Sequence, residues 1–211
     1  LAAMMLSYQP VRALAQIHIG LNSGLAAASR LFEVLDQKSH IIDKKNDPKL
    51  SVSDGSIEFN NVNFGYPGQN NNALSNINMK INGGETIAFV GHSGAGKSTI
   101  FNLLPRFYDI QSGQITIDNQ SISNVSLNTL RKNISLVSQD VFLFDDTVYS
   151  NISYAKLDAS EEEIFKASQS AAAEEFIKQL NDGYKTIVGE KGVKLSGGQK
   201  QRISIARALL K

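Results

Sequence analysis

No cysteine occurs in this chain of 211 residues, so disulfide bonds cannot contribute to its fold. The absence fits a cytosolic domain, where thiols remain reduced. Histidine is also scarce, and His18, His40 and His92 lie far apart with no further Cys or His at ligand spacing. A metal site made of imidazole and thiolate ligands is therefore not expected.

An excess of charge of either sign is missing as well. Lys and Arg number 21 and Asp and Glu number 20, which leaves no broad basic field for a nucleic-acid partner. No apolar run reaches the length of about 18 residues that a bilayer requires, and no signal-peptide pattern is present. Because the chain begins at Leu1 and stops at Lys211 inside an expected helix, we expect it to be a piece of a longer protein.

Residues 1–36 show the periodicity of a helix, which Pro10 is expected to break or bend near its start. Two interpretations stay open: an amphipathic helix that packs on its own domain, or the cytoplasmic end of a membrane helix. Residues 37–55 are rich in Lys, Asp, Ser and Asn and are interpreted as a linker, with a new domain near Ser56. The apolar stripe of the helix consists of Leu14, Ile17, Leu21, Leu25, Ala28, Leu31 and Leu35.

Short strands come first in the new domain and helices follow, which predicts an α/β fold. A slip is expected near Asn60 and Asn61, and Ser160 with Glu163 predicts a capping box that opens a helix. The expected strands are 56–64, 77–81, 86–90, 115–117 and 134–137, and the expected helices include 97–104, 127–132, 171–180 and 199–210.

The chemistry begins with Gly91-x-x-x-x-Gly96-Lys97-Ser98, which fits the phosphate-loop pattern in full. Its glycines allow positive φ and let successive N–H groups point at phosphate oxygens, while the following helix adds its positive end. Lys97 is expected to reach the β- and γ-phosphates, and the Ser98 hydroxyl to ligate Mg²⁺. The alternative without nucleotide binding is a glycine-rich turn with an exposed lysine. The residues expected to bind nucleotide here are Gly91, His92, Ser93, Gly94, Ala95, Gly96, Lys97, Ser98 and Thr99.

A second glycine motif follows roughly a hundred residues later, at 195–199. On its own, Ser196 with Gln199 is explained by a capping box for the next helix. However, Leu-Ser-Gly-Gly-Gln at these positions is identical to the signature sequence of the ATP-binding cassette (ABC) family.

The chain therefore resembles the nucleotide-binding domain of an ABC exporter, most closely the bacterial lipid A-exporting type. The resemblance covers essentially the whole chain and includes the short sequence motifs at 107–109, 136–139, 188–192 and 207–210. It implies a P-loop NTPase domain of the ABC type over 56–211, with a mixed core sheet, an antiparallel β subdomain and a helical subdomain at about 145–205. It also implies that 1–36 is the cytoplasmic end of the last helix of a transmembrane domain.

The resemblance implies roles for individual residues. Tyr66 would stack on adenine, although it could instead plug a strand end. Gln139 would touch Mg²⁺ or the attacking water, and with Lys97 it would be catalytic; the alternative for Gln139 is a solvated loop residue. ATP and Mg²⁺ are the implied cofactors, with Ser98 and Gln139 at the metal. The residues that would contact ATP held by a second copy of the domain are Ser196, Gly197, Gly198 and Gln199.

Three further side chains have implied contacts with the membrane domain. Glu190 would meet its intracellular ends, and Phe142 and Phe144 would help form the groove for a coupling helix. A surface carboxylate and two core aromatics are the respective alternatives.

In the family, an apolar strand ending in Asp and Glu and then a switch histidine follow the position of Leu210. None of these lies in this chain. We therefore expect the full-length parent to be an ATPase and this piece alone to hydrolyse ATP poorly, with an apolar gap where the strand would lie.

The leading function is ATP-driven outward transport of lipid A-type lipids across the inner membrane by a homodimer, with this domain on the cytoplasmic side. Export of drugs or peptides is the runner-up, because nothing in the chain touches cargo. Two other classes stay open: a soluble ABC protein acting on DNA or ribosomes, and a non-catalytic nucleotide-binding module. The flanking sequence would discriminate between them.

Overall fold

The computed structural model describes residues 2–37, 39, 41–43, 47–69 and 71–211. It divides into two units, Leu1–Ile42 and Asp43–Lys211, each with its own internal contacts. The boundary between the units falls inside the stretch interpreted as a linker, and residues 38, 40 and 44–46 of that stretch lie outside the described residues.

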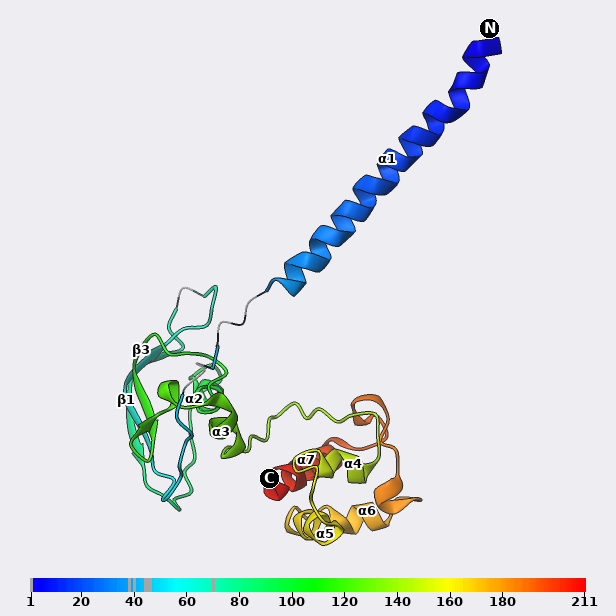
Figure 1. The fold of residues 1–211 in the computed structure, drawn as a ribbon. Coiled ribbons are helices and arrows are strands. Elements are labelled where there is room, and N and C mark those ends of the chain that lie inside the picture. Colours follow the sequence, from blue (N-terminus) through cyan, green and yellow to red (C-terminus); the bar gives the residue numbers. More distant parts are fainter. Residues whose placement is uncertain (1, 38, 40, 44–46, 70) are drawn as a thin grey trace. The chain divides into compact units, whose positions relative to one another are not determined.

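The first unit is a single helix, α1 (Ala2–Leu35), shown in blue in Figure 1. It agrees with the helix predicted over 1–36 and runs through Pro10 without interruption, so of the predicted break or bend the break does not occur. A proline removes only one backbone donor, and the hydrogen bonds before and after it hold the remaining turns together. The stripe residues Ile17, Leu21 and Leu25 are exposed. Among the described residues, no helix combines the length and hydrophobicity needed to cross a bilayer.

The second unit begins with an antiparallel sheet of four strands in the order β2-β1-β3-β4. The strands are β1 (Ile57–Phe64), β2 (Leu74–Ile81), β3 (Ser112–Ile117) and β4 (Gln120–Ser121). The predicted slip is confirmed, because the β1–β3 register shifts between Asn60 and Asn63 and Asn61 has a φ of 48°. This extra residue lets Phe59, Val62 and Phe64 all enter the core despite their odd spacing.

Helices α2 (Lys97–Leu103) and α3 (Leu127–Lys132) and the short 3₁₀ turn η1 (Ile122–Asn124) accompany the sheet. Apolar residues from these elements and from the strands make one core, in which Phe59, Leu103 and Leu130 are fully buried. The alternation seen in the sequence thus builds a half-buried sheet with helices against its apolar side.

Two predicted strands, 86–90 and 134–137, are not formed, and the described sheet is antiparallel rather than mixed. A strand buried on both faces needs hydrogen-bonded neighbours, and no described residue pairs with either segment in a ladder. Both segments have no assigned helix or strand, and each exposes apolar side chains: Val90 is 94% exposed and Leu136 is 40% exposed.

The rest of the unit is helical, as predicted from residue 145 onward, and Figure 1 shows its helices grouped together in yellow to red. Its helices are α4 (Val148–Ser153), α5 (Glu161–Ser170), α6 (Glu174–Lys178) and α7 (Gly197–Leu210), with 3₁₀ turns η2 (Gly183–Lys185) and η3 (Glu190–Gly192).

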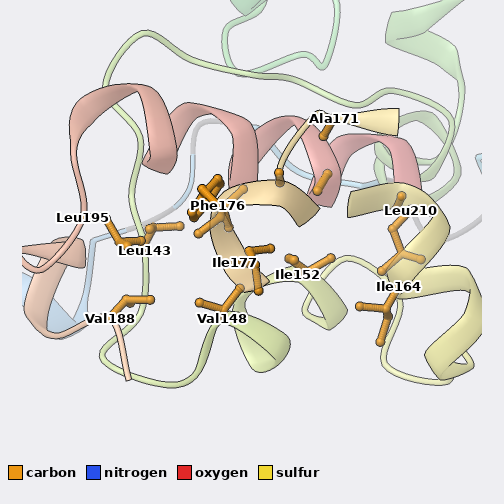
Figure 2. Packing of buried hydrophobic residues seen from close by; sticks show 14 residues of the cluster. Leu143, Val148, Ile152, Ile164, Ala171, Phe176, Ile177, Val188, Leu195 and Leu210 are labelled. Atoms are coloured by element: carbon orange, nitrogen blue, oxygen red, sulfur yellow. The ribbon is translucent and has the colours of Figure 1, made fainter. Parts of the chain in front are cut away.

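These helices enclose a second core, separate from that of the sheet. Figure 2 shows Ile152, Ile164, Ile177 and Leu210 pointing into it from α4, α5, α6 and α7. The capping box predicted for Ser160 and Glu163 is present at the start of α5. The second unit therefore contains two apolar clusters, one under the sheet and one among the helices.

Residues 47–56 run along the sheet as a fixed segment, not as a loose connection. Four successive N–H groups, those of residues 53–56, donate to the carboxylate of Asp118 at 2.7 to 3.1 Å. Leu50 is buried, and its N–H donates to the Thr129 hydroxyl at 3.0 Å. These contacts attach the start of the domain to the β3–β4 turn and to α3.

Candidate nucleotide-binding site

The loop at 91–96 has the backbone shape that the phosphate-loop pattern demands. Gly94 and Gly96 have φ values of 81° and 83°, which side chains other than glycine rarely adopt. A Cβ on Gly96 would lie 2.6 Å from Leu74 Cδ2, whereas one on Gly94 would meet nothing within 4 Å. Gly96 is therefore required both by its conformation and by its close approach to β2.

Lys97, the first residue of α2, folds back over this loop. Its ammonium group donates to the carbonyl oxygens of Gly91 at 3.0 Å and His92 at 2.8 Å. Both carbonyls belong to the glycine loop, so the positive charge is held at the centre of the loop's concave side. This position suits the lysine for an anion that enters the loop.

The backbone donors around Lys97 fit a phosphate group. Helix α2 has no side-chain cap, so the N–H groups of its first turn lack the acceptor that a serine or aspartate would supply. Glycines at 91, 94 and 96 leave the approach to these donors open, and Ser98 is exposed beside them. An uncapped turn, a lysine and an exposed hydroxyl are the donor and ligand set of a magnesium–phosphate site.

Tyr66 follows the end of β1 and contacts helix α2, which begins directly after the phosphate loop. Its hydroxyl is 3.1 Å from the hydroxyl of Thr99, which is buried. Its ring packs edge-on against Phe64 at 4.9 Å and Tyr108 at 5.1 Å between centroids. These contacts make Tyr66 a strand-end plug, and its half-buried ring keeps some exposure that adenine could use.

The second glycine motif opens α7 with the predicted capping box. The Gln199 N–H donates to the Ser196 hydroxyl at 3.3 Å, and the Ser196 N–H donates to Gln199 Oε1 at 2.9 Å. Leu195 is buried in the helical core, whereas Ser196, Gly197 and Gly198 are exposed. A Cβ on either glycine would meet nothing within 4 Å, so this turn presents bare backbone to its surroundings.

Gln139 is exposed and lies at a bend in the segment 134–142, which has no helix or strand and joins the two cores. Beside it a groove of about 380 Å³ is lined by this segment, Tyr154 and the last turns of α7. Phe142 and Phe144 pack edge to face at 5.3 Å, and both are at least 39% exposed, so they are not core residues. Glu190 is exposed in η3.

Two cations on α7 were missed by sequence reasoning. Arg207 donates to the carbonyl oxygens of Phe142 and Asn151, and Lys211 donates to those of Arg131 and Ile134. Burial lowers the pKa of both Arg207 and Lys211. The sequence carries no signal for these contacts, because the acceptors lie 56 to 80 residues away along the chain.

The structure brings some of the predicted residues together and leaves others apart. Tyr66 contacts Thr99 in the helix that follows the phosphate loop, whereas the contacts described for Ser196 and Gln199 stay at the start of α7. Among the described residues, no group of three or more acidic or histidine side chains could hold a metal ion. A magnesium ion would therefore depend on Ser98, on phosphate oxygens and on water.

Comparison with known proteins identifies the family. The family model for the ABC transporter matches residues 74–211. The chain is 48% identical over 210 residues to the ATP-dependent lipid A-core flippase of Desulfotalea psychrophila (strain LSv54 / DSM 12343), covering 100% of this chain and 36% of that protein. It is 47% identical over 204 residues to the ATP-binding/permease protein YgaD of Bacillus subtilis (strain 168), whose name provisionally assigns it multidrug export, covering 97% and 35%.

A solved structure agrees with these relatives. The structure of a bacterial Atm1-family ABC exporter with ATP bound has a TM-score of 0.84 and 43% identity, and the match covers 90% of this chain and 33% of that one. The chain thus spans about a third of the length of the relatives that it matches. Its phosphate loop, its signature turn and these matches together place the chain in the ABC transporter family.

Proposed function

We propose that this chain is the ATP-binding domain of an exporter that uses ATP binding and hydrolysis to move lipid A-type lipids outward across the inner membrane. In this proposal α1 continues into the protein's own transmembrane domain, and the ATP-binding domain lies on the cytoplasmic side. The observation that carries nucleotide binding is Lys97, held over a glycine loop whose helix has no side-chain cap. The cargo rests on the flippase relatives.

Each residue has a part in the proposed reaction. Lys97 exchanges its two carbonyl partners for the β- and γ-phosphates, where its charge stabilises the anion. Backbone N–H groups of the first turn of α2 hold the phosphates, and Ser98 ligates Mg²⁺, which neutralises charge on the transferred group. Tyr66 offers the exposed part of its ring to adenine, and Gln139 approaches the metal or the water.

Dimer closure is the second part of the proposal. The exposed turn at Ser196, Gly197 and Gly198 offers backbone N–H groups and a hydroxyl, and a Cβ built on either glycine would meet nothing within 4 Å. We infer that this turn contacts ATP held by a second copy, arranged head to tail, so that ATP stabilises the closed dimer.

The test of the phosphate site is Lys97→Ala. Losing a charge-assisted contact to phosphate should weaken Mg-ATP binding roughly tenfold to a hundredfold, measured by calorimetric titration. Lys80→Ala is the matched control, because Lys80 is an exposed lysine on β2. If the two variants bind Mg-ATP with equal affinity, Lys97 is not part of the binding site.

The test of the signature turn is Ser196→Ala, with Ser160→Ala as its matched control. Both serines cap a helix through the same reciprocal box, so each change should cost about 1 kcal/mol of stability. Only Ser196→Ala should also reduce dimer formation with Mg-ATP, measured by sedimentation. If both variants dimerise like the parent, Ser196 serves as a cap alone.

Export of drugs is the second candidate, favoured by the similarity to YgaD. The two cargoes are separated by reconstituting the protein that contains this chain in lipid vesicles. ATP-dependent movement of labelled lipid A is expected; movement of a hydrophobic dye without lipid A would favour the second candidate.

A further inference from the structure

Helix α7 and the residue that directly follows it carry four basic side chains that all donate to main-chain carbonyls. Near its start, Lys200 Nζ donates to the carbonyl of Lys191 at 3.0 Å and Arg202 Nη1 to that of Ala172 at 3.2 Å. At its end, Arg207 and Lys211 bond carbonyls of a different part of the chain. A cation that hydrogen-bonds to backbone oxygens restrains the main chain at that point, whatever side chains that part of the chain carries.

The last two cations hold both ends of the segment that contains Gln139. At the beginning of the segment, Lys211 Nζ donates to the carbonyl of Ile134 at 2.6 Å and to that of Arg131. At the end, Arg207 Nη1 donates to the carbonyl of Phe142 at 3.1 Å. Between these two attachments the segment forms no helix or strand and is largely exposed. Its conformation therefore depends on the two attachments, because fixing both ends of a loop removes much of its freedom.

Arg207 is itself rigidly placed. Its Nε donates to the carbonyl of Asn151 at 2.8 Å and its Nη2 to Asn151 Oδ1 at 3.0 Å. The guanidinium also lies 6.0 Å from the ring centroids of both Phe144 and Tyr154. Arginine keeps its charge in such a setting, so the contact with Phe142 is present at every physiological pH.

We propose that Arg207 and Lys211 are positioning residues for Gln139, and that α7 links the signature turn at its beginning to the Gln139 segment at its end. The helix has 14 residues and therefore spans about 21 Å as one rigid element. A displacement at Ser196 moves Arg207 and Lys211 with it, and so moves both attachments of the segment. The inference rests on the proposed function, because Gln139 matters only if this chain binds Mg-ATP.

The absence of cysteine makes the experiment direct. In the 211-residue chain, Gln139→Cys provides a unique site for a nitroxide spin label, whose rotational correlation time reports the freedom of the segment. Arg207→Met and Lys211→Met should each shorten that time roughly threefold, toward the value of an unattached loop. Arg202→Met and Lys200→Met are the matched controls, because they remove cations of the same helix that bond other parts of the chain.

Circular dichroism checks that each variant is folded. Should Arg207→Met fail this check, Lys211→Met decides the test, because Lys211 is exposed and its loss leaves both cores intact. Lys211→Arg should restore the slow motion, since arginine can donate to the same two carbonyls. Equal mobility in all four methionine variants would overturn the proposal.

A second readout uses chains that keep Gln139. The ratio of the ATP dissociation constants without and with Mg²⁺ should fall severalfold in Lys211→Met but not in Lys200→Met, because a displaced Gln139 no longer supports the metal. An unchanged ratio, with saturable Mg-ATP binding in both variants, would count against positioning of Gln139. If no variant binds Mg-ATP, the proposed function fails, while the spin-label result still decides whether α7 holds the segment.

Discussion

At the residue scale, Asp118 shows how a single carboxylate fixes the start of the domain. It accepts hydrogen bonds from four successive N–H groups and from the hydroxyls of Ser53 and Ser56. These donors hold the pKa of the Asp118 carboxyl far below its usual range, chiefly through the N–H groups of Ser53 and Gly55. Nothing in the sequence pairs residue 118 with residues 53–56, so this contact could not be predicted.

Asp118→Asn should lower the melting temperature at pH 6, because an amide oxygen accepts less strongly than a carboxylate and carries no charge. A lowered folded-state pKa stabilises the protein fully above the unfolded value of about 4, and this contribution is lost as pH falls toward the folded value. The difference in melting temperature between parent and variant should therefore shrink from pH 6 to pH 2. Asp182→Asn, which removes an exposed carboxylate near η2, is the control for the loss of one negative charge.

Gly96 and Gly94 offer a matched pair for the phosphate loop. Both have positive φ, so replacement by alanine costs each about 1–2 kcal/mol of backbone strain. Only Gly96→Ala also places a methyl group 2.6 Å from Leu74 Cδ2 and 2.8 Å from the carbonyl of Ala73. Chemical denaturation should find Gly96→Ala the less stable of the two by at least about 1 kcal/mol. If Gly96→Ala and Gly94→Ala are equally stable, β2 shifts enough to accommodate the methyl group.

At the scale of elements, local signals predicted those elements whose stabilisation is local. The capping boxes at Ser160 and Ser196 are readable because their partners lie three residues apart. The slip near Asn61 is readable because it interrupts the alternation of apolar residues within β1 itself. The strands expected at 86–90 and 134–137 failed for the opposite reason. Their apolar runs indicate a need for burial, but a strand exists only where another strand pairs with it.

Val90→Ser tests the state of the 86–90 segment. Because its side chain is 94% exposed, the substitution should change the free energy of unfolding by less than about 0.5 kcal/mol. Ile117→Ser, in β3 with a 4% exposed side chain, should cost several times more, roughly 2–4 kcal/mol. Denaturant titration measures both. A large loss for Val90→Ser would mean that the segment is buried against a neighbour.

At the scale of the whole molecule, the second unit is built around two apolar clusters rather than one. The sequence indicated this division through its change from strands to helices near residue 145. The phosphate loop and the signature turn could also be predicted from the sequence, because each is a contiguous sequence motif. The attachments made by Arg207 and Lys211 were beyond it, since they join α7 to carbonyls at sequence distances of 56 to 80 residues.

Because the two cores are separate, a cavity made in one core should destabilise the elements around it and leave the other core unchanged. Ile177→Ala removes buried volume from the helical core, and Ile115→Ala does the same under the sheet; each should cost about 2–5 kcal/mol locally. Hydrogen exchange should accelerate in α5 for the first variant and in β1 for the second, with little effect across the boundary. Uniform acceleration in both regions would instead describe one cooperative unit.

The contacts of Lys97 within its own loop carry a consequence for discrimination among nucleotides. If the loop binds a nucleotide as proposed, the ligand has to replace the hydrogen bonds from the ammonium to the oxygens of Gly91 and His92. A monophosphate carries less negative charge than a polyphosphate to offset their loss, so we expect it to bind more weakly than a diphosphate or triphosphate.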